Sequence, residues 1–286
     1  MRLLRACASA LDINDPFLRK IKGIYMRSLF GAPGRSVVVT EAGRGLGREI
    51  ALELAKQRSI VFGTAESARE AKEMRRASSG RVSLIVCDLE KTNMVNAWAA
   101  GVSEAIGVSG LDLLISTAGH LEPGPLEILP LEEIRRGFET SVFGRLAIIN
   151  AFLPALRMAQ GRIIQISGWT PEVAFSFEGP SSASQAAMEA FSVAYRAELE
   201  PFGIDVVIAS VREIEAATLG SPVSLERIDN RISATQRRLY GKQLAACLEK
   251  SPVVKDNHDL AMIAQGVVDL AMQSQVPLKV AMDRGA

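Results

Sequence analysis

Short apolar runs alternate with longer segments of helical periodicity from residue 36 onward. Ser36–Thr40 is a β-branched run typical of a buried strand, and Ile50 and Leu54 recur at helical spacing within Arg48–Gln57. Five later runs have strand character: Ile60–Thr64, Val82–Cys87, Leu111–Ser116, Arg162–Ser167 and Asp205–Ser210. Helical stretches lie between them, for example Leu131–Leu156 and Ser184–Glu200. This alternation predicts an α/β protein with a doubly wound parallel sheet between two layers of helices.

The carboxyl ends of the predicted strands are the expected place for a ligand, because doubly wound sheets bind ligands there. The loops after the first, fourth, fifth and sixth strands should frame the pocket. Beyond residue 215 the alternation stops. The stretch 216–255 is polar and expected to be partly helical, Met262–Met272 has helical spacing, and Pro277–Val280 is a candidate last strand. We therefore expect one domain over 35–286, in which 216–286 forms a helical substrate lid and the C-terminal region.

Charge is nearly balanced over the 286 residues, with a net charge of +1, but it is unevenly distributed. The first 35 residues carry seven basic side chains against Asp12 and Asp15, a net charge of +5, which leaves −4 on the rest. The near-neutral total argues against nucleic acid as a partner. We expect a basic N-terminal extension over 1–34. Its apolar positions between 17 and 29 fall on one helix face, which suits either an anionic membrane surface or packing on a protein.

Other compositional features exclude several classes of protein. The three cysteines, Cys7, Cys87 and Cys247, are too few and too scattered for a disulfide framework or a zinc site, so no metal is expected. No run approaches 18 consecutive apolar residues, so no helix is expected to span a bilayer. We expect a cytoplasmic protein, with membrane association or an organelle, directed by the N-terminal segment, as the alternative.

A glycine-rich turn, Thr40–Gly47, lies directly between the first strand and the first helix. Backbone amides and a helix N-terminus can hold a pyrophosphate at such a turn. The turn resembles the Thr-Gly-x-x-x-Gly-x-Gly motif of the short-chain dehydrogenase/reductase family, which implies a Rossmann-type fold. The resemblance runs weakly from 36 to the C-terminus and is strongest from about 111 to 210, where Gly124–Glu127, Phe152–Pro154 and Glu198–Ile204 look like the retinol and hydroxysteroid dehydrogenase branch.

That resemblance implies a dinucleotide site and NADP in particular, because Arg44 stands where NADP-preferring members often carry a basic residue. The cofactor-binding positions that it implies are Thr40, Arg44, Gly45, Leu46, Gly47, Asp88, Leu89, Ala118 and Gly119. Four departures weaken the expected binding. Glu41 replaces the first glycine, Thr117 an asparagine, Gln185 a lysine and Val211 a glycine. The carboxylate of Glu41 is expected to repel phosphates.

The family's four catalytic positions hold other residues in this chain. Its chemistry needs a tyrosine that exchanges a proton with the substrate oxygen and a lysine four residues later on the same helix face. Gly179–Gln185 aligns with the family's Gly-Pro-Tyr-Ser-Ala-Ser-Lys, which places Ser181 at the tyrosine and Gln185 at the lysine. The catalytic serine and asparagine positions hold Gly168 and Ser141. A serine hydroxyl is a much weaker acid than a phenol, so the family's hydride chemistry is expected to be lost.

Several other side chains near the expected pocket admit more than one interpretation. His120 follows Gly119 and could pair with Ser181 as base and nucleophile, although no acidic partner for it is evident. Glu178 and Glu139 are expected to be solvated charges. The aromatic residues Trp169, Phe175 and Phe177 suit either an apolar pocket or the core.

The sequence thus favours a protein that binds a hydrophobic small molecule in the former catalytic cleft, as a non-redox biosynthetic enzyme or as a binding or scaffold subunit. One alternative is an atypical NADP-dependent oxidoreductase that acts on a retinoid-, steroid- or ketone-like substrate. Another is a non-catalytic partner that dimerises with an active homologue, and a homodimer is expected otherwise.

Overall fold

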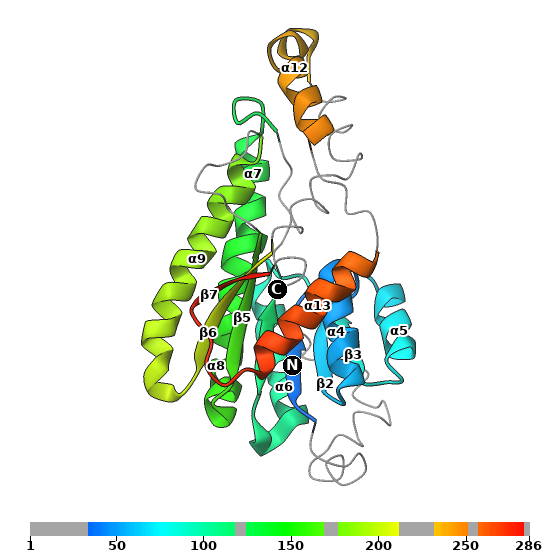
Figure 1. Cartoon of the computed structure of the whole chain (residues 1–286), viewed down its shortest axis with the longest axis vertical. Coiled ribbons are helices and arrows are strands. Elements are labelled where there is room, and N and C mark those ends of the chain that lie inside the picture. The colour runs from blue at the N-terminus through cyan, green and yellow to red at the C-terminus, as the bar shows by residue number, and fades with distance from the viewer. Residues whose placement is uncertain (1–33, 118–123, 169–176, 212–231, 251–256, 283–286) are drawn as a thin grey trace.

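A seven-stranded sheet forms the centre of the chain. The computed structural model describes residues 34–117, 124–168, 177–211, 232–250 and 257–282. Within them all strands are parallel and lie in the order β3-β2-β1-β4-β5-β6-β7, and Figure 1 shows the sheet with its covering helices. The chain therefore has the doubly wound fold that its alternation predicts. The expected extension over residues 1–34, and its amphipathic part at 17–29, lie outside the described residues apart from residue 34.

Six predicted strands are present with small changes at their ends. They are β1 (Ser36–Val39), β2 (Ile60–Ala65), β3 (Val82–Val86), β4 (Leu113–Ser116), β5 (Arg162–Gly168) and β6 (Asp205–Val211). The seventh, β7 (Lys279–Met282), begins two residues later than expected. The four central strands are almost wholly buried because helices cover both faces of the sheet, which explains their unbroken apolar runs.

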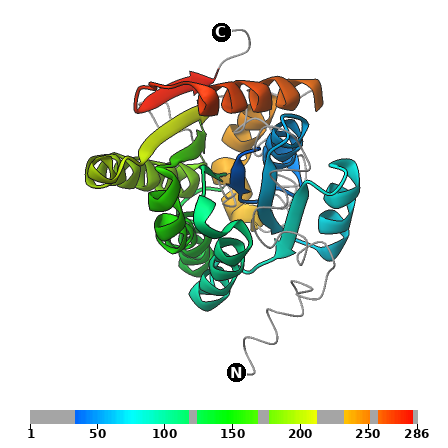
Figure 2. The ribbon, with the colours of Figure 1, turned by 90° about the horizontal axis from the view of Figure 1, so that it is seen from below.

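Two layers of helices cover the sheet, as the view from below in Figure 2 shows. On one face lie α4 (Gly45–Lys56) and α13 (Asn257–Met272), which bury Ile50, Leu54 and Val267 against β1, β4 and β6. On the other lie α6 (Thr92–Ile106), α8 (Arg145–Ala159) and α9 (Gly179–Leu199), around Trp98 and Phe152. Short α5 (Ala68–Ala77) follows β2. The rings of Trp98 and Phe152 meet edge to face at 5.1 Å.

The predicted helix over Leu131–Leu156 consists of three parts. It begins as α7 (Leu131–Phe138), continues through a π-helical turn at Glu139–Gly144, and ends as α8. This 29-residue helix is the one element among the described residues that is long and apolar enough to cross a membrane, which differs from the expectation of none. Its apolar side chains Ile148, Ile149 and Phe152 are fully buried against the sheet.

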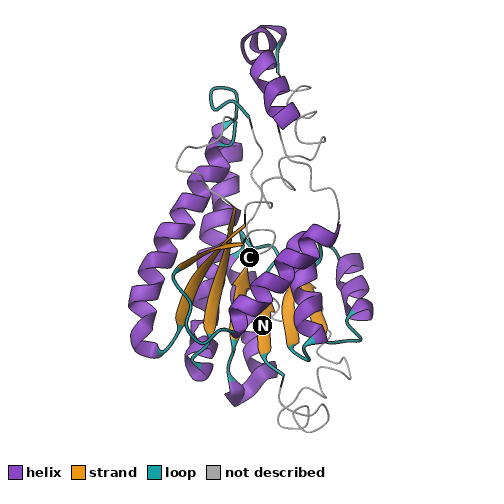
Figure 3. Ribbon diagram, in the orientation of Figure 1, coloured by secondary structure: helices purple, strands orange, loops and turns teal. Residues whose placement is uncertain are grey.

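The C-terminal region stands partly apart from the sheet. Helix α12 (Ala234–Lys250) lies at the top of Figure 1, and Figure 3 shows it above the strands of the sheet. Ile232 and Leu244 pack there against Ile128 from the segment that precedes α7. The polar stretch is therefore helical in part, as its sequence predicts.

Candidate functional site

The turn after β1 keeps the backbone geometry of a phosphate cradle. Gly45 has a φ of +53°, where a side chain is strained, and a Cβ on Gly47 would lie 2.5 Å from the carbonyl oxygen of Glu41. Helix α4 starts within the same turn. Glu41 occupies the first glycine position and has a φ of +50°, so the left-handed conformation of the turn persists without its glycine. Glu41 therefore differs from the family's glycine in its side chain, while its backbone keeps the left-handed conformation.

The Glu41 side chain is held by the neighbouring strand end. The Thr117 hydroxyl, just after β4, donates to its carboxylate at 3.1 Å, and the Thr117 backbone N–H donates to the Thr40 hydroxyl at 2.9 Å. Burial raises the pKa of the Glu41 carboxyl, while the Thr117 hydrogen bond and the charges of Arg145 and Arg44 act in the opposite direction. Thr117 and Glu41, two of the four departures from the family pattern, are thus one hydrogen-bonded unit.

A buried guanidinium lies beneath this unit. Arg145, the first residue of α8, is 4% exposed. Its Nε donates to the Ser116 hydroxyl at 3.0 Å, and its Nη2 donates to Gln165 Oε1 and to the carbonyl oxygens of Ser116 and Ile166. Burial lowers the pKa of Arg145 to about 10, against the favourable field of Glu41, so the group is still cationic at neutral pH. Arg145 therefore ties the carboxyl ends of β4 and β5 together.

Sequence reasoning missed Arg145, although a signal for it was present. It lies three and four residues before Ile148 and Ile149, so helical periodicity places it on the face that packs on the sheet. A charge on a buried face needs several hydrogen-bond acceptors. Strand ends provide them here, and the sequence alone does not show which carbonyl groups those are.

A cavity of about 350 Å³ opens beside the cradle, at the carboxyl ends of β1, β2 and β3. We call it the acidic cavity. One guanidinium, that of Arg44, lines it together with five carboxyl side chains: Glu41, Glu66, Glu70, Asp88 and Glu90. Arg44 forms an ion pair with Glu66, and Asp88 pairs with Lys91 at 2.8 Å. Arg44 and Asp88 do lie at the cavity where the sequence resemblance places a cofactor, but the carboxylates outnumber the guanidinium.

The four positions that align with the family's catalytic residues lie on the π-helical turn, at the end of β5 and on α9. The Nε2 group of Gln185 donates to the Ser181 hydroxyl at 3.4 Å, one helical turn apart on α9. Ser141 lies in the π-helical turn and Gly168 ends β5. Ser181 and Gln185 are therefore in contact, and the role of the four positions stays a prediction. The hydroxyl of Ser141 and Oε1 of Gln185 are buried and have no hydrogen-bond partner.

Two further buried polar atoms without a hydrogen-bond partner in the described part of the chain lie on the face of the sheet that α8 and α9 cover. They are Nε2 of Gln165 on β5 and the hydroxyl of Ser210 on β6. Because alternate residues of a strand face the same way, Gln165 shares its side with Ile163, and Ser210 shares its side with Val206. Both of these apolar residues belong to the core cluster under α8 and α9. The former catalytic region thus keeps unsatisfied polar groups, which bind water or a ligand in most proteins.

The prediction that Glu178 is a solvated charge is wrong, because the structure buries it. The same prediction for Glu139 is confirmed, because that side chain is exposed. Glu178 immediately precedes α9, and only 5% of it is exposed. Its side chain does not cap that helix. Burial raises the pKa of the Glu178 carboxyl to about 7. The sequence did not predict this burial because loops are usually solvated, whereas Leu126 and Tyr240, remote in sequence, lie against Gly179 and Phe177 on either side of Glu178.

Stability should therefore depend on pH through Glu178. A carboxyl whose pKa rises on folding stabilises the protein fully below the unfolded value near 4.5, and this contribution is lost as pH rises towards 7. We expect Glu178→Gln to match the parent at pH 4.5 and to exceed its unfolding free energy at pH 8 by about 2 to 3 kcal/mol. Urea unfolding across this pH range measures the difference, and a difference that stays constant with pH contradicts the prediction.

An apolar lid cluster covers the start of α9. Phe177 and Tyr240 of α12 meet edge to face at 6.3 Å, and Ile128, Ile232 and Leu244 pack around them. The Tyr240 hydroxyl donates to Glu127 at 2.7 Å, which also links α12 to the segment before α7. Phe177 thus packs in a small apolar cluster, which agrees with the core interpretation, and the apolar pocket stays a prediction. The substrate lid expected over 216–286 stays a prediction.

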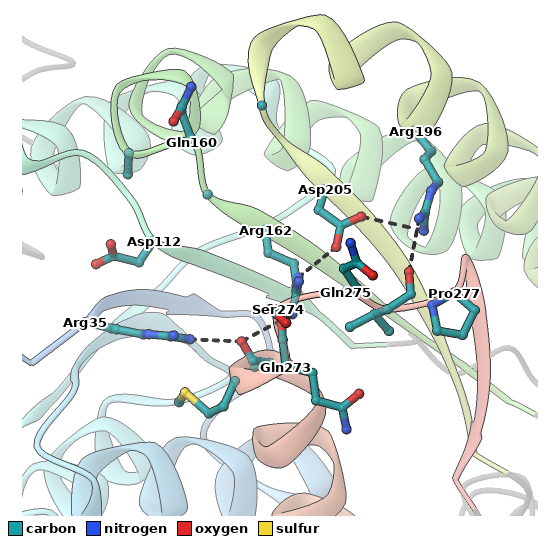
Figure 4. A pocket seen from close by; sticks show the side chains of 16 residues that line it. Arg35, Asp112, Gln160, Arg162, Arg196, Asp205, Gln273, Ser274, Gln275 and Pro277 are labelled. Atoms are coloured by element: carbon teal, nitrogen blue, oxygen red, sulfur yellow. Dashed lines mark hydrogen bonds and ion pairs between the residues drawn. The ribbon is translucent and has the colours of Figure 1, made fainter.

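A second, larger recess of about 990 Å³ lies at the opposite end, among the amino ends of the strands. Figure 4 shows its arginines directed at backbone carbonyls and at Asp205. Arg35 and Arg162 donate to carbonyl oxygens in the last turn of α13, including that of Ala271, and Arg196 donates to that of Val276. These donors satisfy the open carbonyls of a helix C-terminus. The recess is therefore explained by capping of α13.

Some expected site residues lie outside the part of the chain that the structure describes. They are Ala118, Gly119 and His120 after β4, and Trp169 and Phe175 after β5. The pairing of His120 with Ser181 stays a prediction. Val211 is described, and it ends β6 fully buried in the core.

The strand order and the glycine cradle define a Rossmann-type protein of the dinucleotide-binding class. The chain belongs to the short-chain dehydrogenase family, whose model matches residues 35–221. Estradiol 17-beta-dehydrogenase 2 of Rattus norvegicus is 28% identical over 201 residues, which cover 69% of this chain and 53% of that enzyme. Retinol dehydrogenases are also among the relatives, which supports the expected branch.

Two further comparisons extend this picture. The 3-ketodihydrosphingosine reductase of Bacteroides thetaiotaomicron is 33% identical over 174 residues, which cover 60% of this chain and 61% of that enzyme. A metagenomic short-chain oxidoreductase, solved in complex with NADP, has a TM-score of 0.66 at 21% identity and covers 87% of this chain and 96% of its own. At that identity the likeness shows the fold alone. The chain spans little more than half the length of the rat enzyme.

Proposed function

We propose that this member of the family binds a small apolar molecule in the former catalytic cleft and does not transfer a hydride to or from it. The contact between Ser181 and Gln185 carries the proposal. At the positions where the family needs a phenol and an ammonium, this chain has a hydroxyl and a neutral amide hydrogen-bonded to each other at 3.4 Å. Neither group can supply a proton with the acidity of a lysine-assisted tyrosine.

The surroundings of the dinucleotide cradle support the same proposal. A pyrophosphate would meet the carboxyl group of Glu41 inside the cradle and the acidic cavity beside it. A 2′-phosphate would have to compete with Glu66 for Arg44. The glycine geometry fits a dinucleotide, but the charge of these residues opposes it.

The apolar nature of the ligand is supported by the lid cluster and by the relatives. Phe177, Ile128 and Tyr240 provide an apolar cover above the start of α9. Estradiol, retinol and ketodihydrosphingosine, which appear in the names of relatives, are molecules with a large apolar part and an oxygen function.

The test is a comparison of cofactor binding and turnover. Calorimetric titration of the full chain with NADPH and NADH is expected to give no micromolar binding. Incubation with NADPH and a panel of retinoid, steroid and simple ketones is expected to give no oxidation of the nucleotide above background. Ligand-observed NMR with the same ketones should show binding in the cleft.

A matched variant keeps the experiment informative. Ser141→Asn, Gly168→Ser, Ser181→Tyr and Gln185→Lys introduced together restore the family's side chains, and turnover is expected only if the nucleotide also binds. Steady turnover by the parent contradicts our proposal and supports the atypical NADP-dependent oxidoreductase, which the oxidoreductase relatives favour.

The expected dimer, either of this chain or with an active homologue, also stays a proposal. Phe143 on the π-helical turn and Phe191 and Val193 on α9 are 41% to 54% exposed, so these two helices have apolar groups available for a partner.

A further inference from the structure

Glu178 is a buried carboxyl group for which the described part of the chain provides no capping role. It occupies the N-cap position of α9, yet its side chain makes no capping hydrogen bond. Carboxylates at this position usually accept hydrogen bonds from the first backbone N–H groups of the helix, which stabilise them. Here only the backbone carbonyl of Glu178 takes part, and it accepts from Ser182 at 2.9 Å. The carboxyl is therefore available for another use.

Helical spacing places Glu178 beside the former catalytic pair. Glu178 is the N-cap of α9, and Ser181 and Gln185 follow it by three and seven residues, which is the spacing of one side of a helix. Gln185 is buried, with its Oε1 unsatisfied, and its Nε2 donates to the Ser181 hydroxyl. Since that hydroxyl oxygen accepts from Gln185, its own hydrogen is free to be donated to a ligand oxygen.

The cover above Glu178 is apolar. Its neighbour Phe177 adopts a φ of +74°, and its carbonyl oxygen accepts from the Gly124 N–H at 2.7 Å. A Cβ on Gly179 would lie 3.0 Å from the Leu126 side chain, which therefore closes over the start of the helix. Phe177 also packs on Tyr240 of α12. Glu178 is thus 5% exposed beside half-buried and exposed apolar side chains at the start of α9.

A carboxyl group in such surroundings is suited to proton transfer. Burial raises the pKa of Glu178 to about 7, so both protonation states are populated near neutral pH. General acid–base catalysis is most effective when the pKa of the group lies near the working pH. Proton transfer also needs no nucleotide, so it is compatible with the acidic cavity and with the residues at the four former catalytic positions.

We propose that Glu178 is the acid–base group of this cleft and exchanges a proton with the carbon next to the carbonyl of a small apolar ketone. The inference rests on the proposed function, because it needs the apolar ligand in the cleft. The C–H bond breaks and its proton moves to a Glu178 carboxylate oxygen. The released electron pair forms a C=C bond, and the C=O π pair moves to the oxygen, which accepts a hydrogen bond from Ser181.

Return of the proton completes the reaction without a change in oxidation state. The protonated Glu178 gives its proton back to the same carbon, which restores the ketone, or to a conjugated carbon, which yields an isomer. No electron leaves the substrate, and no co-reactant is consumed. In heavy water the first outcome replaces hydrogen by deuterium at that carbon, which makes the step observable even when the natural ligand is unknown.

The experiment measures deuterium exchange into estrone, an apolar ketone, by mass spectrometry in the presence of the full chain. Ligand-observed NMR first establishes whether estrone binds to the parent and to each variant. We expect exchange by the parent to exceed that of Glu178→Gln by at least 100-fold, with a bend near pH 7 that the variant lacks. Glu178→Asp should recover part of the rate. Glu198→Gln, a change at an exposed carboxyl on the same helix, should leave it unaltered.

The outcomes separate the two proposals. Binding of estrone with equal exchange by the parent and by Glu178→Gln overturns the role of Glu178 and leaves the proposed function standing. Failure of estrone and the other apolar ketones to bind overturns the proposed function, and the acid–base role with it. Unfolding does not explain a slow variant, because glutamine matches glutamate in size and should be the more stable at pH 8.

Discussion

Glu41→Gly is expected to bind NADPH at least tenfold more tightly than the parent chain. The substitution removes a carboxyl from the cradle and introduces the residue that a φ of +50° favours. In the parent, the positive charges of Arg145 and Arg44 interact with the Glu41 carboxyl. Without that carboxyl, both charges can attract the phosphates of the nucleotide instead. At an effective dielectric constant near 20, one charge removed about 6 Å from a phosphate changes the energy by roughly 2 to 3 kcal/mol, enough for a tenfold effect.

Calorimetric titration at low salt measures this change, and two controls separate its causes. Glu41→Gln keeps the bulk of the side chain and removes its charge, so an intermediate affinity is expected. Glu49→Gln alters a glutamate of the same helix start that pairs with Arg48, and it should have no effect. Equal affinity of Glu41→Gly and the parent would show that the cradle carboxyl does not limit nucleotide binding.

The second large effect concerns stability. Arg145→Met should lower the unfolding free energy by about 3 to 5 kcal/mol, because it leaves the carbonyls of Ser116 and Ile166 and the side chain of Gln165 without their buried donor. For a chain of this size the melting temperature should fall by roughly 10 °C. Thermal and urea unfolding provide the measurement.

A matched control lies on the same helix. Arg157 is exposed and rests over the Phe202 ring at 4.8 Å, so Arg157→Met should cost under about 1 kcal/mol. The double variant Glu41→Gln/Arg145→Met should lose less than the sum of its single changes, since each removes the charge that compensates the other. A fall of less than 2 °C for Arg145→Met, or strict additivity, contradicts this account.

The predictions for Glu41 and Arg145 concern one group of interacting side chains. Glu41, Thr117 and Arg145 come from three separate segments, the turn after β1, the end of β4 and the start of α8. In sequence Glu41 and Thr117 look like two unrelated departures from the family pattern, and nothing in the spacing links Arg145 to them. In the structure they compensate one another, because a carboxyl in the cradle is held by a hydroxyl and faces a buried guanidinium.

The sequence by itself determined the fold and the alignment of the site. Unbroken apolar runs predicted the central strands because both faces of a parallel sheet are covered, and motif spacing placed Ser181, Gln185, Ser141 and Gly168 in one region. Such features depend on local periodicity and on fixed spacing along the chain, which a sequence displays directly.

Only the tertiary structure decided the electrostatic character of the site. The burial of Glu178 depends on segments far away in sequence, such as Leu126 and Tyr240, which cover the start of α9. The burial of Arg145 depends on carbonyls at the ends of two strands. A pKa reflects the solvent that remains around a group and the charges within a few ångströms of it, and neither is encoded by neighbouring residues. For that reason the sequence showed which residues stand at the family's catalytic positions, whereas the structure showed that Glu178 and Arg145 are buried.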